Sequence, residues 1–225
     1  MTELASRAWH HALRALLMLG VLLFVSAGTL HYGQAWLYWT IYAIAHCFNT
    51  AYFLRRDPAL IARRLHAGPA AEPSLSQRRI QAVTAICLLL MFVLAGLQRR
   101  LAWPSLPAAA SVIGAAVFVL ALLMIFLVFR QNSYAGSTVD VVQGQTIATQ
   151  GLYGYVRHPM YAASAIAFLA TPAALGSSWA WLGAVPATIA MIVRLLDEER
   201  QLHQRLPAYS AYCQTVRFRL LPGIW

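Results

Sequence analysis

The stretch that decides the fold is PAAASVIGAAVFVLALLMIFLVF, which occupies residues 107–129 and contains no charged side chain. A bilayer core is crossed by about 20 consecutive apolar residues in a helix, so this stretch predicts a transmembrane helix. The whole chain agrees, because 60% of its 225 residues are hydrophobic and only 11% are charged. Soluble domains carry about 25% charged residues. We therefore expect the apolar surface to face lipid.

Five other apolar segments lie on either side of this stretch. They occupy residues 11–30, 34–54, 80–97, 160–175 and 178–196. Gly176 and Ser177 leave only a short turn between the last two, which predicts an antiparallel helical hairpin. The segment 160–175 is short and Pro172 interrupts it, so five spans are the alternative to six. The expected fold is an all-α integral membrane protein with about six transmembrane helices.

The arginines predict the orientation of these helices. All 17 basic residues are Arg, the formal net charge is +10, and six of the arginines lie between residues 55 and 79. Most others lie near the N-terminus, as Arg7 and Arg14 do, or follow residue 129; Arg99 and Arg100 are the exceptions. Cytoplasmic loops carry the excess of positive charge, so an even number of spans predicts that both termini are cytoplasmic. Because the charges lie between apolar segments, and not on one soluble face, we expect no nucleic-acid partner.

Two polar clusters flank the hairpin. The first is GLYGYVRHPMY at residues 151–161, in which Pro159 suits the first turn of a helix and leaves His158 at its mouth. The second is RLLDEE at residues 194–199, where Arg194 and Glu198 are four apart and share a helix face. Taken separately, these could be a helix start with interfacial aromatics and a solvated helix end with an Arg194–Glu198 ion pair. The hairpin turn brings both clusters to one membrane face, which favours a shared site.

Other polar residues give weaker signals. His46 and Asn49 are three apart in the second segment; a hydrogen bond between helices is the favoured interpretation, and an acceptor channel is the alternative. Cys47, Cys87 and Cys213 are far apart, and the histidines have no metal-ligand spacing, so we expect no metal.

The region from Arg130 to the end of the chain resembles the isoprenylcysteine carboxyl methyltransferase family and its phospholipid methyltransferase relatives. The similarity rests on residues 143–161, on Arg194 followed by Glu198 and Glu199, and on the tail LPAYSAY…VRFRLLPGIW. Two positions depart from the family pattern: Gln145 stands where His is frequent, and Leu152 where Pro is frequent. The upstream segments match only in being hydrophobic. The implied division is four N-terminal transmembrane helices in residues 1–129 and a methyltransferase-like region in residues 130–225.

The resemblance implies S-adenosylmethionine as cofactor in a cytoplasmic loop, and a lipid-soluble acceptor that enters from the bilayer. The cofactor residues that it implies are Gln143, Gln145, Thr146, Ile147, Ala148, Tyr153, His158, Pro159, Met160, Tyr161 and Glu198. Arg194 matches the position that meets an acceptor carboxylate, and His158 is the candidate base for an amine acceptor.

The predicted function is therefore methyl transfer to a lipidic or isoprenoid acceptor, with a carboxylate of the isoprenylcysteine type preferred. A carboxylate is ionised at neutral pH and needs no general base. The alternatives are methylation of a phospholipid amine or a thiol, an NADPH-dependent membrane reductase, and a non-catalytic membrane protein. The predicted location is the bacterial inner membrane, with membrane lipids as neighbours.

Overall fold

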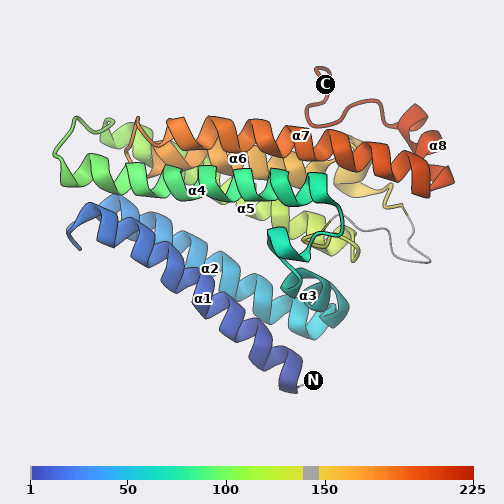
Figure 1. Cartoon of the computed structure of the whole chain (residues 1–225), viewed down its shortest axis with the longest axis horizontal. Helices are drawn as coiled ribbons and strands as arrows, with labels where there is room; N and C mark the ends of the chain where they lie inside the picture. Colours follow the sequence, from blue (N-terminus) through green and yellow to red (C-terminus); the bar gives the residue numbers. More distant parts are fainter. Residues whose placement is uncertain (1, 139–146) are drawn as a thin grey trace.

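The structure is a computed structural model that describes residues 2–138 and 147–225 (Figure 1). Within these residues all regular secondary structure is helical. The α-helices are α1 (Thr2–Ala27), α2 (Gly33–Arg56), α3 (Pro58–Leu65), α4 (Leu75–Arg100), α5 (Ala108–Gln131), α6 (Pro159–Ala174), α7 (Trp181–Arg205) and α8 (Pro207–Thr215). Two short 3₁₀ turns, η1 (Pro69–Ala71) and η2 (Gly151–Gly154), complete the set. Each apolar segment predicted from the sequence coincides with one of these helices.

The hydropathy of the helices agrees with an integral membrane protein. Among the described residues, α1, α4 and α5 are long and apolar enough to cross a membrane, and α6 is a shorter apolar helix. Helix α2 carries polar residues such as Gln34, His46 and Asn49, and the last third of α7 is charged. These side chains lower the hydropathy of α2 and α7, so the number of six spans stays a prediction.

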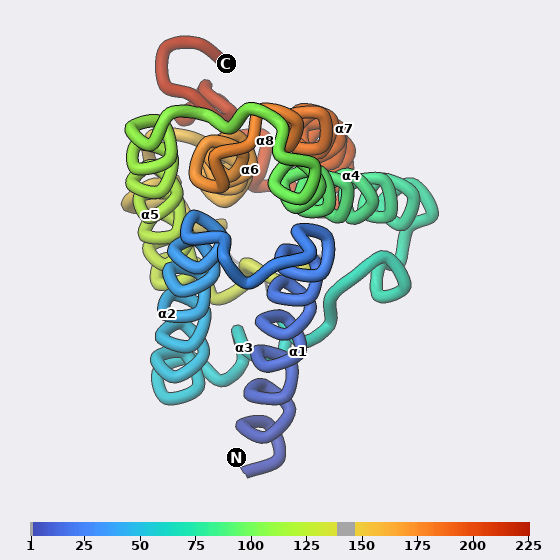
Figure 2. The backbone as a smooth tube through the Cα atoms, turned by 90° about the vertical axis from the view of Figure 1, so that its left-hand side faces the viewer, coloured from blue at the N-terminus to red at the C-terminus, as the bar shows by residue number. Residues whose placement is uncertain are grey.

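Helices α4, α6 and α7 run along the long axis of the molecule, and α5 is inclined to it (Figure 1). Viewed along that axis, α1 and α2 lie to one side of them, with α3 between their ends (Figure 2). Glycines let these helices approach closely. A Cβ at Gly114 of α5 would lie 2.4 Å from the Ala174 nitrogen of α6, and one at Gly183 of α7 would lie 2.5 Å from the Cys87 carbonyl oxygen of α4.

Both termini lie toward the same end of the long axis, together with α3 and α8 (Figure 1). The connection from α3 to α4, the end of α5 and the start of α6 are at this end too, whereas Arg99 and Arg100 end α4 at the opposite one. The prediction that the polar clusters of residues 151–161 and 194–199 meet at one end of the hairpin is confirmed, because Tyr161 hydrogen-bonds to Glu198.

Candidate active site

A cavity of about 450 Å³ opens at the end of the helices where α3 and α8 lie (Figure 1), which we call the arginine-rich end. Its wall is built from α3, α4, α6, α7 and α8 and from the segments that flank residues 139–146. Both predicted regions, residues 1–129 and 130–225, contribute to the cavity. Arg64, Gln81 and Leu88 of the first region line it together with residues of the second. The site therefore needs both parts of the chain.

The cavity changes character with depth. Tyr153, His158 and Glu198 line its polar end. Leu88, Phe168 and Met191 line it further along α4, α6 and α7, away from the charged helix ends. The ten residue steps from His158, the N-cap of α6, to Phe168 correspond to about 15 Å of helix. The cavity thus joins a polar mouth to an apolar interior at membrane depth, and such a shape suits a polar ligand at one end and an acyl or prenyl chain at the other.

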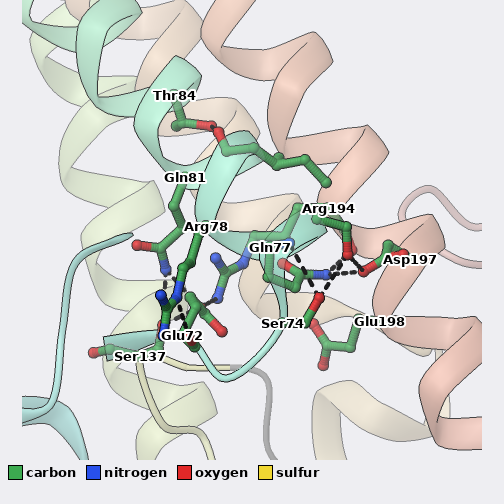
Figure 3. Close-up of polar contacts among 12 residues, drawn as sticks. Glu72, Ser74, Gln77, Arg78, Gln81, Thr84, Ser137, Arg194, Asp197 and Glu198 are labelled. Atoms are coloured by element: carbon green, nitrogen blue, oxygen red, sulfur yellow. Dashed lines mark hydrogen bonds and ion pairs between the residues drawn. The ribbon is translucent and has the colours of Figure 1, made fainter. Parts of the chain in front are cut away.

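Arg194 of α7 lies at the junction of the two ends, and Glu72 is its ion-pair partner. The distance from Arg194 Nη2 to Glu72 Oε1 is 2.6 Å, and the Glu72 side chain is fully buried (Figure 3). Arg194 Nη2 also donates to the Ser137 carbonyl oxygen (3.0 Å), and Gln81 of α4 donates to the same Glu72 oxygen (2.8 Å). Arg194 Nη1 is buried and has no hydrogen-bond partner among the described residues.

Tyr161 stands between Arg194 and Glu198. Arg194 Nε donates to the Tyr161 hydroxyl (3.1 Å), which in turn donates to Glu198 Oε2 (2.5 Å). The prediction of a direct Arg194–Glu198 ion pair is therefore wrong for the described residues. Tyr161 of α6 lies between the two side chains, and Arg194 forms its ion pair with Glu72 instead. Glu198 meets only the Tyr161 hydroxyl, which leaves a cavity-lining carboxylate without a cationic partner in the described part of the chain.

Glu199, the neighbour of Glu198, points into an ion cluster beside the cavity, and this cluster holds the C-terminal tail. Its carboxylate lies 3.2 Å from His158 Nε2, 3.3 Å from Arg157 Nη1 and 2.7 Å from Arg219 Nε. Tyr209 of α8 donates to it as well (3.3 Å). The backbone N–H groups of residues 157 and 158 donate to the carbonyls of residues 218 and 219, so the tail is fastened beside the mouth of α6.

Charge in this cluster perturbs the acidity of its members. Burial raises the pKa of the Glu199 carboxyl, but hydrogen bonds from His158 and Arg219 and the charge of Arg157 outweigh burial and lower that pKa to about 2. Burial raises the pKa of the Tyr209 phenol above its ordinary range, and the nearby Glu199 carboxylate adds to the rise. Burial also raises the pKa of Tyr153 to about 12. Glu199 is thus an anion, and the two phenols are neutral, near neutral pH.

The structure brings most of the predicted site residues to the cavity. Those that line it are Ile147, Ala148, Tyr153, His158, Met160, Tyr161, Arg194 and Glu198. Pro159 does not line it; it is buried at the first position of α6. Gln143, Gln145 and Thr146 lie outside the described residues. The roles assigned to all of these residues stay predictions.

The polar side chains of α2 and the arrangement of potential metal ligands were also predicted from the sequence. His46 Nε2 and Asn49 Oδ1 are buried and lack a hydrogen-bond partner among the described residues, so the favoured hydrogen bond between helices is wrong for these two atoms. The His46 ring stacks on the Tyr42 ring of the same helix, with the ring centroids 5.3 Å apart. Over the same residues, no group of three His, Cys, Asp or Glu side chains is arranged to hold a metal ion.

Sequence reasoning missed Arg64, Glu72 and Tyr209 as parts of this site. Arg64 and Glu72 lie between α2 and α4, in a region whose arginines predicted only a cytoplasmic loop. The one feature of the sequence that could have pointed to Glu72 is that acidic residues are rare, since the chain has only seven of them. Tyr209 was visible only as part of the tail pattern.

Comparison with known families agrees with this geometry. Residues 109–208 match the family model described as phospholipid methyltransferase. This match confirms the suspected relationship to that family, and it supports a membrane methyltransferase as the general class. It covers α5, α6 and α7 with His158, Arg194 and Glu198, but not Arg64 or Glu72. A comparison with curated proteins found no match.

Proposed function

We propose that this protein is a membrane-embedded methyltransferase that uses S-adenosylmethionine to methylate a lipidic acceptor, preferably a carboxylate of the isoprenylcysteine type. The observation that carries the proposal is the cavity whose polar mouth and apolar interior meet at Arg194, within the part of the chain that matches the phospholipid methyltransferase family. When bound, S-adenosylmethionine supplies a methyl group on a sulfonium centre.

The residues at the polar mouth fit such a donor. Glu198 offers a carboxylate without a cationic partner among the described residues, which suits the ammonium group of a methionine moiety. Arg157 lines the cavity, and its Nε is buried without a hydrogen-bond partner, which suits the carboxylate of that moiety. Tyr153 and Tyr212 add aromatic surface at the same end for a nucleoside base.

The role of the protein in methyl transfer is to hold donor and acceptor in line and to exclude water. Arg194 Nη1 can donate a hydrogen bond to an acceptor oxygen while Nη2 keeps its ion pair with Glu72. A carboxylate acceptor needs no base. An amine acceptor must lose a proton, and His158 is the base that we propose for it.

Methylation of a phospholipid amine is the second candidate. It is favoured by the description of the matching family model and by Glu72, which neutralises Arg194 and so reduces its attraction for a carboxylate. A thiol acceptor remains the third possibility of the same chemistry.

Ligand-induced stabilisation separates a methyltransferase from a reductase. A ligand that binds only the folded state raises the apparent melting temperature. We expect S-adenosylhomocysteine, and not NADPH, to stabilise the detergent-purified protein. The substrate class is then identified by incubating the protein and acceptor lipids with donor that carries a radiolabelled methyl group. Stabilisation by NADPH alone would overturn the proposal.

A further inference from the structure

Arg64 is a residue of the cavity wall to which the proposed chemistry gives no role. It lies on α3, outside the part of the chain that matches the methyltransferase family. Its Nη1 donates to the Ala135 carbonyl oxygen (3.1 Å), and its guanidinium carbon lies 4.2 Å from the centre of the Phe129 ring. These contacts hold the guanidinium at the cavity without supplying a negative charge.

The other arginines of the cavity differ from Arg64 in this respect. Arg194 is paired with Glu72, and Arg157 is paired with Glu199. No carboxylate in the described residues lies within ion-pair distance of Arg64. Burial lowers the pKa of the Arg64 guanidinium to about 10, which still leaves it charged near neutral pH.

An enclosed cation without a counter-charge is costly, and buried charges in proteins are paired or bind a ligand. A cation–π contact with one ring compensates only part of such a penalty. The same cavity wall continues from Arg64 to Thr84, Ala85 and Leu88 on α4, an increasingly apolar surface. A ligand that satisfies both features has an anionic group next to an apolar chain.

We propose that Arg64 binds the anionic group, carboxylate or phosphate, in the headgroup of the lipid acceptor. This assignment rests on the proposed methyltransferase function and deepens it, because it makes an anionic headgroup part of what the cavity selects. In an isoprenylcysteine-type acceptor the anion is the carboxylate that is methylated. In a phospholipid amine the anion is the phosphate, which leaves the amine free to react.

The test compares anionic amphiphiles with neutral ones of the same chain. The probes are N-acetyl-S-farnesylcysteine against its methyl ester, and dioleoyl phosphatidic acid against dioleoylglycerol, each titrated into full-length protein in detergent. A hydrogen bond to a charged group contributes roughly 1.5–3 kcal/mol, or about a ten- to hundred-fold difference in affinity. We expect the wild type to prefer the anionic member of at least one pair by at least that factor, and Arg64→Gln to reduce the preference by about that factor.

The controls separate recognition from folding. Arg63→Gln removes the adjacent arginine, which holds the Ser133 carbonyl through Nε and Nη2 but does not line the cavity; it should keep the preference. Arg64→Lys should keep part of it, because Lys retains the charge without the planar donor pattern. S-adenosylhomocysteine affinity, measured on every variant, reports whether the fold and donor site are intact.

The outcomes are distinct. The farnesyl pair and the phosphatidic acid pair tell a carboxylate headgroup from a phosphate one. Competition by inorganic phosphate as strong as that by phosphatidic acid would overturn the assignment to a lipid headgroup. Equal preference in wild type, Arg64→Gln and Arg63→Gln, with donor affinity intact, would overturn the role of Arg64 and leave the proposed function standing. Loss of donor binding in the wild type would instead refute the proposed function.

Discussion

Arg194 is the side chain on which the acceptor class depends. If an acceptor carboxylate binds it, Arg194→Ala should raise the acceptor KM by roughly ten- to a hundred-fold, because a charge-assisted hydrogen bond of roughly 1.5–3 kcal/mol is lost. Affinity for S-adenosylhomocysteine should change much less. Arg194→Lys should rescue only part of the loss.

Both affinities are measured on the same purified variant, which supplies the control. Equal loss for donor and acceptor would contradict the assignment, because it would mean that Arg194 acts only through Tyr161 and Glu198.

Glu199 makes a prediction about pH. Its pKa falls from an ordinary value of 4.5 to about 2 in the folded protein. A depressed carboxyl pKa stabilises the fold above the unfolded pKa, and this stability is lost as the pH falls through the folded one. Thermal unfolding should therefore show a gap between wild type and Glu199→Gln that is full near neutral pH and narrows as the pH falls from 4.5 toward 2. A gap that does not change with pH would argue against the ion cluster around Glu199.

At the scale of elements, the connection between α3 and α4 is held in place by its contacts with α4 and α7. Residues 68–73 contain Gly and Pro, a composition typical of a loose connection, yet Glu72 is fully buried and ties this loop to Arg194 of α7. Arg78 Nε donates to the Glu72 carbonyl oxygen (2.7 Å) and fixes the start of α4 to the same loop (Figure 3). One ion pair thus couples a loop of the N-terminal half to the candidate site.

Removal of that ion pair gives a stability prediction. Breaking a buried pair by removing one partner leaves an uncompensated charge and costs roughly 3 kcal/mol or more. Glu72→Gln should destabilise the protein strongly, whereas the double variant Glu72→Gln with Arg194→Gln should recover part of the loss. Unfolding of all four members of this cycle in detergent measures the coupling. Strictly additive effects would show that the pair contributes nothing.

The same elements show how far sequence reasoning reaches. Runs of apolar residues reveal transmembrane helices because every exposed position must suit lipid, so each predicted segment became a helix. The approach of residues 158–161 to residues 194–199 followed from the short turn at Gly176 and Ser177. The pairing of Arg194 with Glu72 did not, because it joins residues 122 positions apart and depends on how a loop folds back. Glu198 and Glu199 are adjacent, and only the packing of α7 against α6 and the tail decides which faces the cavity.

At the scale of the whole molecule, both termini and the tail lie toward one end (Figure 1), and the cavity opens at this same arginine-rich end. We expect this end to be cytoplasmic. In a variant without the three native cysteines, Gly154→Cys should react with an impermeant thiol reagent only from the cytoplasmic side. Ser105→Cys, beyond the far end of α4, should react only from the opposite side. The reverse pattern would place the donor site on the wrong face for a cytoplasmic methyl donor.

The central claim is that the polar mouth of the cavity binds a methyl donor through Glu198. Asp197 gives a matched control, since it is the adjacent carboxylate on α7 but accepts hydrogen bonds from Gln77 and Ser76 of α4 instead of lining the cavity. The most direct measurement is calorimetric titration of S-adenosylhomocysteine into wild type, Glu198→Gln and Asp197→Asn. We predict that Glu198→Gln weakens binding by roughly ten-fold or more, while Asp197→Asn binds like the wild type. Absence of binding in the wild type, or equal affinity in all three proteins, would contradict the account.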